Sequence, residues 1–426
     1  MSAKLAVEGG NPAKTTPNPG MYPGGLAIDE EEKKELIQAI DRKHLFRYYM
    51  PDGMASKVSE LEALLAERTG SRHCLATNSG TSALVSAFMA CGVGPGHEVI
   101  IPSVTYWSSA ASVLDVRAVP IIAEVDDSIS IEPSDIENKI TPRTKAIMPV
   151  HMRGAPCDMD PIMEIARKHD LAVIEDSAQA MGGSYRGKML GSLGDCGCFS
   201  MHYYKTITSG EGGFLTTDDE RIYTLAQSAH DSAACWRPDR FAPERFPGEL
   251  SYGFDFRMSE LAGAVGLAQL RKLPGLRNLM RKNKKRILDG IKGLPGVEFR
   301  RMNDSDGDTA TCIIFFVPTV KLCEKSVKAL KAEGVDAMHL YHRLIPDWSI
   351  YAHWQHMIDR RTPTPEGCPY TCPHREAPPP EYSKDMCPRT IDLVSRAVHI
   401  NVPPQLTDDD CDAIAEGIRK VVEAYL

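Results

Sequence analysis

The chain has 426 residues, of which 42% are hydrophobic and 25% charged, and its formal net charge is −8. This length can bury one large core, or one core plus a smaller second domain. The acidic balance offers no basic stripe for a nucleic-acid backbone, so we expect no nucleic-acid partner. The sequence has no run of about 18 apolar residues, so we expect no membrane span, and no signal peptide is recognisable. Twelve cysteines without an export signal are typical of reduced thiols, which predicts a cytoplasmic protein.

Residues 1–28 are rich in Gly and Pro and predict an N-terminal arm on the surface. Helices are expected over 29–43 and from Val58 onward, where apolar residues recur at helical spacing. Short apolar strands then alternate with helical stretches, which favours a mainly parallel sheet covered on both faces. The seven expected strands are His73–Ala76, Glu98–Ile101, Val119–Ala123, Ala146–Val150, Ala172–Glu175, Gly197–Ser200 and Gly213–Thr217. Ligands of such sheets lie beyond the carboxyl ends of the strands, so the site is expected in the polar turns there.

A long helix over Met258–Leu288 is expected to end a large domain, 29–288, and to lead into a smaller C-terminal α/β domain, 289–426. In that second domain we expect strands at Val297–Arg301 and Cys312–Val317 and helices at Lys321–Glu333 and Asp408–Ala424. The Pro- and Cys-rich residues 359–390 predict an irregular loop. Its Cys368, Cys372, His374 and Cys387 could in principle supply four metal ligands, but a single irregular cluster of cysteines rarely meets the full ligand set of a zinc site, so we predict no metal.

Three short motifs after predicted strands carry chemistry. The first, TNSGTSAL (77–84), opens a helix with small residues, so Gly80, Thr81 and Ser82 could present N–H groups to a phosphate. The same letters also suit a plain N-cap. The second, VIEDSAQA (173–180), ends a strand with Asp176, whose carboxylate suits a pyridinium nitrogen or simply caps the next turn.

The third motif, CFSMHYYKTITSGEGG (198–213), places Lys205 in an apolar, aromatic stretch. Desolvation there lowers the pKa of a lysine and favours the neutral amine that forms imines. Ser200, five residues earlier, could bind a phosphate. A lysine in such a context can also extend its amine to solvent with no chemical role.

The order and spacing of these motifs resemble the DegT/DnrJ/EryC1/StrS family of sugar aminotransferases. The matching blocks span residues 58–290 and are NSGTSAL, IPSVTYWSSA, ITPRTKAIMPVH, IEDSAQAMGGSYRGK, GSLGDCGCFS, KTITSGEGG and FRMSELAGAVGLAQL. The resemblance implies the α/β fold of fold-type I pyridoxal-phosphate (PLP) transferases, with a mainly parallel seven-stranded sheet in the large domain. It also implies PLP as the cofactor and a homodimer with shared active sites.

The resemblance assigns roles to individual residues. Lys205 would hold PLP as an imine and move the substrate proton, and Asp176 would pair with the pyridine nitrogen. Gln179 would lie near the ring, and Tyr106 would stack on it. The phosphate would be bound by Gly80, Thr81 and Ser200.

A further segment, residues 253–258, is implied to reach the active site of the partner subunit. The family commonly has Asn where this chain has Asp255, and a carboxylate cannot take its place beside a phosphate because like charges repel. Either Arg257 supplies that contact or the segment is arranged differently in this protein.

Substrate-contacting candidates are Arg153, His230 and His339. Arg153 follows a strand end and could bind a carboxylate or phosphate, although a surface role is open too. The resemblance implies transfer of an amino group from an amino acid, glutamate or glutamine, to a keto-sugar or cyclitol-type ketone by a ping-pong mechanism. A non-sugar keto or amino acid substrate, a sugar dehydratase of the same fold, and a regulatory protein remain alternatives. Lys205 argues against the dehydratase, because those enzymes carry His at that position.

Overall fold

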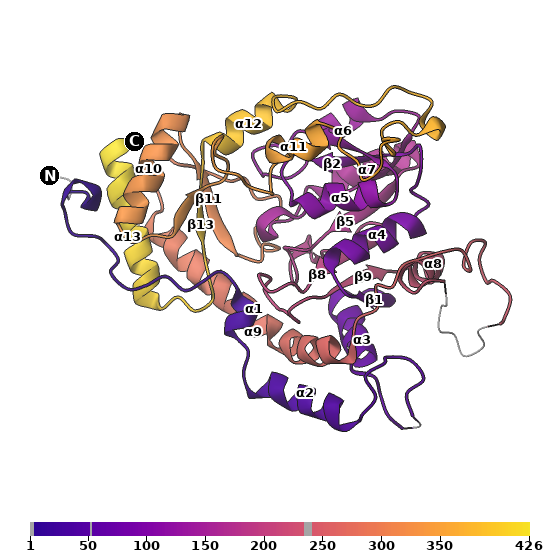
Figure 1. The fold of residues 1–426 in the computed structure, drawn as a ribbon. Coiled ribbons are helices and arrows are strands. Elements are labelled where there is room, and N and C mark those ends of the chain that lie inside the picture. The colour runs from indigo at the N-terminus through magenta and orange to yellow at the C-terminus, as the bar shows by residue number, and fades with distance from the viewer. Residues whose placement is uncertain (1–3, 52, 234–240) are drawn as a thin grey trace.

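Seven strands form the larger sheet of the computed structural model, which describes residues 4–51, 53–233 and 241–426 (Figure 1). Their order is β1-β9-β8-β5-β4-β2-β3. Strand β9 runs antiparallel to both β1 and β8, and the other neighbours are parallel, which confirms the expected fold class. The strands are β1 (His73–Thr77), β2 (Glu98–Pro102), β3 (Val119–Ala123), β4 (Thr144–Ile147), β5 (Ala172–Asp176), β8 (Cys196–Ser200) and β9 (Gly213–Thr217). A separate hairpin joins β6 (Ser184–Tyr185) to β7 (Lys188–Met189).

Strand β4 ends three residues before the expected position. Pro149 follows two residues after Ile147 and has no N–H to continue the ladder. Val150 and Arg153 therefore belong to the turn that follows β4. This places them at the end of the sheet where ligands bind.

Helices cover both faces of the large sheet. On one face α4, α5 and α8 pack against alternate strand residues such as Ile101 and Ile174. On the other face α6 and α7 pack against the intervening residues, such as Ile100 and Val173. The helices are α1 (Pro23–Leu26), α2 (Glu30–Asp41), α3 (Lys57–Thr69), α4 (Gly80–Ala90), α5 (Trp107–Asp115), α6 (Pro133–Lys139), α7 (Met159–His169), α8 (Glu220–His230), α9 (Glu260–Gly290), α10 (Val320–Ala332), α11 (Gln355–Ile358), α12 (Pro388–Ser395) and α13 (Asp408–Tyr425).

A smaller antiparallel sheet follows the long helix α9, with the order β10-β11-β13-β12. Its strands are β10 (Glu298–Phe299), β11 (Cys312–Phe316), β12 (Ala337–His339) and β13 (Ala397–Asn401). Helices α10 and α13 pack on it. Of these four strands, the sequence predicted only β10 and β11. The irregular loop was expected over 359–390, but that end is wrong because α12 already begins at Pro388. Proline suits the first turn of a helix, because the N–H groups there have no acceptor within the helix and the lack of one costs no hydrogen bond. The division of the chain at residue 288 stays a prediction.

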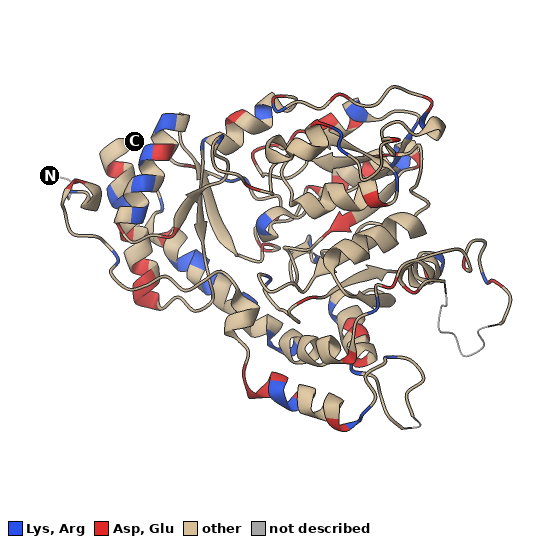
Figure 2. Ribbon diagram, viewed as in Figure 1, with Lys and Arg blue, Asp and Glu red and all other residues tan. Residues whose placement is uncertain are grey.

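Acidic residues of α13 lie beside basic residues of α9 (Figure 2). Asp408 contacts Lys282 at 2.6 Å, and Asp412 contacts Arg286 at 2.6 Å. Exposed ion pairs of this kind each contribute little to stability. They line the contact of α13 with the second half of α9, where buried apolar residues of both helices share one core.

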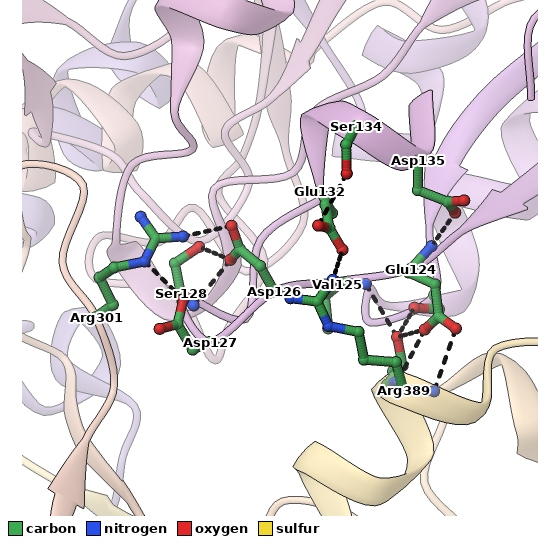
Figure 3. A network of polar contacts seen from close by, with 12 residues as sticks. Glu124, Val125, Asp126, Asp127, Ser128, Glu132, Ser134, Asp135, Arg301 and Arg389 are labelled. Carbon is green, nitrogen blue, oxygen red and sulfur yellow. Dashed lines mark hydrogen bonds and ion pairs between the residues drawn. The ribbon is translucent and has the colours of Figure 1, made fainter. Parts of the chain in front are cut away.

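A polar network joins the loop after β3 to the small sheet and to α12 (Figure 3). Arg301, next to β10, donates to Asp127 at 2.6 Å. Glu132 pairs with Arg389, and Glu124 accepts the backbone N–H of Arg389 at 3.2 Å. These contacts hold the small sheet against one edge of the large one.

The N-terminal arm is more deeply integrated than expected. Leu5 is buried in the hydrophobic core between the small sheet and its helices. Farther along, Met21 and Pro23 border a cavity near Lys205. Residues 1–3 of the predicted arm lie outside the described residues. Within the described part of the chain, none of the helices combines the length and apolar character that a membrane span requires.

Candidate active site

A cavity of about 640 Å³ opens where β1, β2, β4, β5 and β8 end. Turns after these strands supply most of its wall, and β11, β12 and β13 of the small sheet supply the opposite side. The structure brings eight of the predicted site residues to this cavity: Gly80, Thr81, Tyr106, Arg153, Asp176, Gln179, Ser200 and Lys205.

The first turn of α4 forms one end of the cavity. Ser79 is its N-cap, and its hydroxyl accepts the N–H of Ser82 at 3.0 Å. Among the described residues, no protein acceptor meets the N–H groups of Gly80 and Thr81. A Cβ on Gly80 would lie 2.9 Å from Cβ of Ser200, so glycine permits this close approach of α4 to β8. Two free N–H groups, the helix dipole and Ser200 thus converge as they do in phosphate sites.

Ser82 was predicted to contact the phosphate, but it does not line the cavity. Its N–H binds the N-cap, and its hydroxyl donates to Oδ1 of Asn78 at 2.6 Å. Both groups are therefore engaged in building the helix start. Ser79, which the sequence did not single out, lines the cavity instead.

Asp176 ends β5 and is only 5% exposed. One carboxylate oxygen accepts the hydroxyl of Ser109 at 2.7 Å, and the other accepts the N–H of Ala178 at 3.1 Å. No basic side chain of the described residues forms an ion pair with it. A buried carboxylate without a counter-ion is costly, so this one suits a cationic group of a ligand in the cavity.

Lys205 faces the same cavity from the turn after β8. Burial lowers the pKa of its amine, Asp176 acts in the opposite direction, and Arg153 lowers it further. The residue is partly exposed and lines the cavity. Such an amine reaches its neutral, nucleophilic form at a lower pH than a surface lysine does.

Gln179 and Tyr106 complete the wall near Lys205 and Asp176. Oε1 of Gln179 accepts the backbone N–H of Arg153 at 3.1 Å, so it also holds the turn after β4. Tyr106, the N-cap of α5, is 50% exposed and lines the cavity, which leaves its ring open to a flat ligand.

His230 and His339 do not line the cavity, so the structure does not support their predicted substrate contacts. His230 is fully buried at the end of α8, where its Nδ1–H donates to the carbonyl of Gln227, and burial lowers its pKa to about 3. His339 lies next to Cys323 instead, with 3.6 Å between Nδ1 and Sγ. Strand alternation explains this, because the neighbouring Met338 faces the cavity.

Asp255 and Arg257 also lie away from this chain's cavity. The guanidinium of Arg257 contacts Asp231 and, at 2.8 Å, Asp255. Asp255 thus acts as a counter-ion within its own chain. A contact with the cofactor of a partner subunit stays a prediction for both residues.

Sequence reasoning missed the residues of the small sheet that face the cavity. His399 and Asn401 on β13 and Thr311 before β11 all line it. The signal was present in the sequence Ala397-Val-His-Ile-Asn, where polar residues alternate with the core residues Val398 and Ile400.

The residues of the cavity fit PLP, the cofactor that the resemblance implies. A free helix N-terminus suits its phosphate, a buried carboxylate suits its ring nitrogen, and a partly desolvated lysine suits its aldehyde. Within the described ranges, no group of three or more His, Cys, Asp or Glu is arranged to hold a metal ion.

Comparisons with known proteins agree with this geometry. A sequence profile of the DegT/DnrJ/EryC1/StrS aminotransferase family matches residues 27–372. The GDP-perosamine synthase of Caulobacter vibrioides is 46% identical over 247 residues, which cover 58% of this chain and 63% of that protein. An L-glutamine:2-deoxy-scyllo-inosose aminotransferase of Streptomyces lividus is 36% identical over 296 residues, 68% of each chain. The crystal structure of DesI in the presence of its TDP-sugar product has a TM-score of 0.74 and 27% identity, covering 97% of this chain and 95% of that one. With its profile match over most of its length, the chain belongs to the DegT/DnrJ/EryC1/StrS aminotransferase family.

Proposed function

We propose that this protein is a PLP-dependent aminotransferase that moves an amino group from L-glutamine or L-glutamate to a keto-sugar or cyclitol ketone. The observation that carries the proposal is the convergence of Lys205, Asp176 and the free first turn of α4 on one cavity. Family membership and the names of the relatives support the same reaction class. A ping-pong reaction follows, since both substrates must use the same cavity in turn.

Different residues of the cavity would bind different parts of the cofactor. The N–H groups of Gly80 and Thr81 and the hydroxyl of Ser200 would bind its phosphate. The carboxylate of Asp176, oriented by Ser109, would accept the ring N–H and keep it protonated. When bound, the cofactor supplies the electron sink for the carbon that loses its proton.

Lys205 would both attach the cofactor covalently and transfer protons. When it is not attached to the cofactor, its Nζ would be a neutral amine within the cavity. Burial favours that neutral form, so Nζ would accept the α-proton of the donor and hold it for transfer. In the second half-reaction the same atom would deliver a proton to the carbon of the acceptor.

Loss of covalently bound PLP in Lys205→Ala is the test of this proposal. The purified wild-type protein is expected to show the visible absorbance of lysine-bound PLP, and borohydride reduction should label the peptide that holds Lys205. Lys188→Ala, a change at an exposed lysine, is the matched control and should keep both properties. If the wild type binds no PLP, or if Lys205→Ala retains aminotransferase activity, the proposal is wrong.

The amino donor and acceptor are tested through the two half-reactions. L-Glutamine and L-glutamate should convert the bound PLP to its amino form faster than other amino acids do. Keto-sugars and cyclitol ketones should then restore the original absorbance. Restoration by simple 2-keto acids alone would remove the sugar or cyclitol part of the proposal.

The proposal includes a homodimer with shared active sites, located in the cytoplasm. Exposed apolar side chains on the arm and α2, such as Leu26 and Ile37, support a subunit interface, and the described cysteines are free thiols. Mixed subunits of Lys205→Ala and Arg257→Gln should regain activity in about a quarter of the sites if each site uses both chains. Mixtures as inactive as the separate variants would refute sharing through this segment.

A further inference from the structure

Arg153 is fixed in an unusual backbone conformation at the cavity wall. Its φ of 56° lies in the left-handed region, which costs energy for any residue other than glycine. Two contacts hold it there: Gln179 accepts its N–H at 3.1 Å, and its carbonyl accepts the hydroxyl of Thr311 at 2.7 Å. The turn after β4 is thereby tied to the small sheet, and the side chain of Arg153 is held at the cavity.

The charge of Arg153 is not balanced by a neighbouring acid. No carboxylate of the described residues forms an ion pair with its guanidinium, and its Nε is buried without a hydrogen-bond partner. Neither of the two acids that line the cavity forms an ion pair with Arg153. Asp176 accepts from Ser109, and Glu211 lies 3.6 Å from His202. A guanidinium held in this way favours an anion that a ligand brings with it.

His399 adds a second unsatisfied group to the same wall. It is 1% exposed on β13, lines the cavity, and neither ring nitrogen has a hydrogen-bond partner. Burial lowers its pKa well below the usual value, and the nearby charge of Arg153 acts in the same direction. The imidazole is therefore neutral and can donate one N–H to an acceptor on a ligand.

We propose that Arg153 and His399 form a subsite for a carboxylate of the substrate. The guanidinium would bind the two carboxylate oxygens with parallel N–H groups, and His399 would donate a further hydrogen bond. The fork of N–H groups on the guanidinium matches the two oxygens of a carboxylate, and the neutral imidazole beside it adds a donor without a further charge. This inference rests on the proposed function, because it assumes that the cavity admits the amino donor and the ketone acceptor. The carboxylate belongs either to the donor or to an acidic acceptor.

Binding of succinate to the PLP-loaded protein tests the subsite directly. By calorimetry, Arg153→Gln is expected to weaken succinate binding about 10- to 100-fold, and His399→Leu by a smaller factor. Succinamide, which has no charge, should bind equally to the wild type and both variants. Arg153→Lys should fall between, because it keeps the charge but not the fork. Arg68→Gln, at an exposed site on α3, is the matched control and should bind succinate like the wild type.

Retained PLP absorbance and an unchanged melting temperature show that a variant is folded. If folded Arg153→Gln binds succinate as tightly as the wild type does, the inference is overturned. Succinate binding needs no transamination. The expected binding pattern in a protein without aminotransferase activity would therefore overturn the proposed function alone.

Separate half-reactions distinguish the two sources of the carboxylate. If the donor supplies it, Arg153→Gln should raise the apparent Kd for L-glutamine about 10-fold or more and leave that for its α-amide unchanged. If the acceptor supplies it, the loss should appear only in the second half-reaction and only with a keto-sugar acid, not with the neutral keto-sugar. An unchanged dependence on the carboxylate in both half-reactions overturns the inference.

Discussion

Glu175, next to Asp176 on β5, provides the most direct test of how the sheet supports the site. Its carboxylate is fully buried and accepts four hydrogen bonds. Three come from backbone N–H groups in the loop 191–194 at 2.7–2.8 Å. The fourth comes from Nε2 of His151 at 2.9 Å. Since Nδ1 of His151 accepts a backbone N–H at 3.1 Å, its Nε2 carries the proton and donates to Glu175.

Glu175→Gln keeps the size of the side chain but replaces one acceptor oxygen with an NH₂ group. Each oxygen accepts two of the four bonds, so two buried N–H donors lose their partner. An unsatisfied buried donor costs about 1–3 kcal/mol, so we expect a destabilisation of about 2–6 kcal/mol. An unfolding entropy of about 2.1 cal/mol/K per residue gives about 0.9 kcal/mol per degree for this chain. The melting temperature should therefore fall by about 2–7 °C.

Thermal unfolding of the apoprotein, followed by circular dichroism, measures this shift without a contribution from the cofactor. Glu137→Gln is the control, because Glu137 pairs with Lys168 on the surface, where such pairs have little effect on stability. Its melting temperature should match that of the wild type. If Glu175→Gln also has the melting temperature of the wild type, the buried hydrogen bonds do not stabilise the protein as argued.

Four further predictions concern the cofactor end of the cavity. The rate at which the apoprotein attaches PLP should rise with pH, with a midpoint below 10.5, since burial lowers the pKa of Lys205. Asp176→Asn should move that midpoint to a lower pH, because the carboxylate of Asp176 stabilises the ammonium form of Lys205. A stopped-flow titration measures the midpoint, and an upward shift would contradict this prediction. Ser109→Ala removes the 2.7 Å bond to Asp176 and should weaken PLP binding about 10-fold in equilibrium dialysis. Gly80→Ala should weaken it at least as much, because the new Cβ would meet Ser200 at 2.9 Å and push the helix start away, and equal affinity would refute that role for glycine.

The cofactor half of the site could be predicted from the sequence because its residues follow strands directly. In a mainly parallel sheet the ends of successive strands meet along one edge, so Gly80, Asp176 and Lys205 had to converge. Ser82 shows the limit of such reasoning. Its place in the motif was clear, but the choice between binding a ligand and capping the helix depends on which way its hydroxyl turns.

The substrate half could not be predicted in the same way. His339 was singled out because the resemblance implies that its region lines the substrate pocket. In a strand, however, only alternate residues share a face, and Met338 takes the side toward the cavity. His230 was chosen for its position before a long insert, and residues 234–240 of that insert lie outside the described residues. The N-terminal residues at the cavity carried no chemical signal, since Met21 and Pro23 contribute only shape.

Arg153 connects the cofactor half and the substrate half of the site and shows why only the first could be predicted from the sequence. Its neighbours in sequence belong to the turn after β4, and its N–H is held by Gln179 at the cofactor side. Its carbonyl is held by Thr311, which enters the small sheet far along the chain. Residues that contact the cofactor must serve both half-reactions, so they are confined to family motifs that a single sequence reveals. Residues of the small sheet such as His399 and Asn401 line the opposite wall of the cavity, away from those motifs. Substrate choice in this chain is therefore expected to follow from Arg153 and His399, where two distant segments meet.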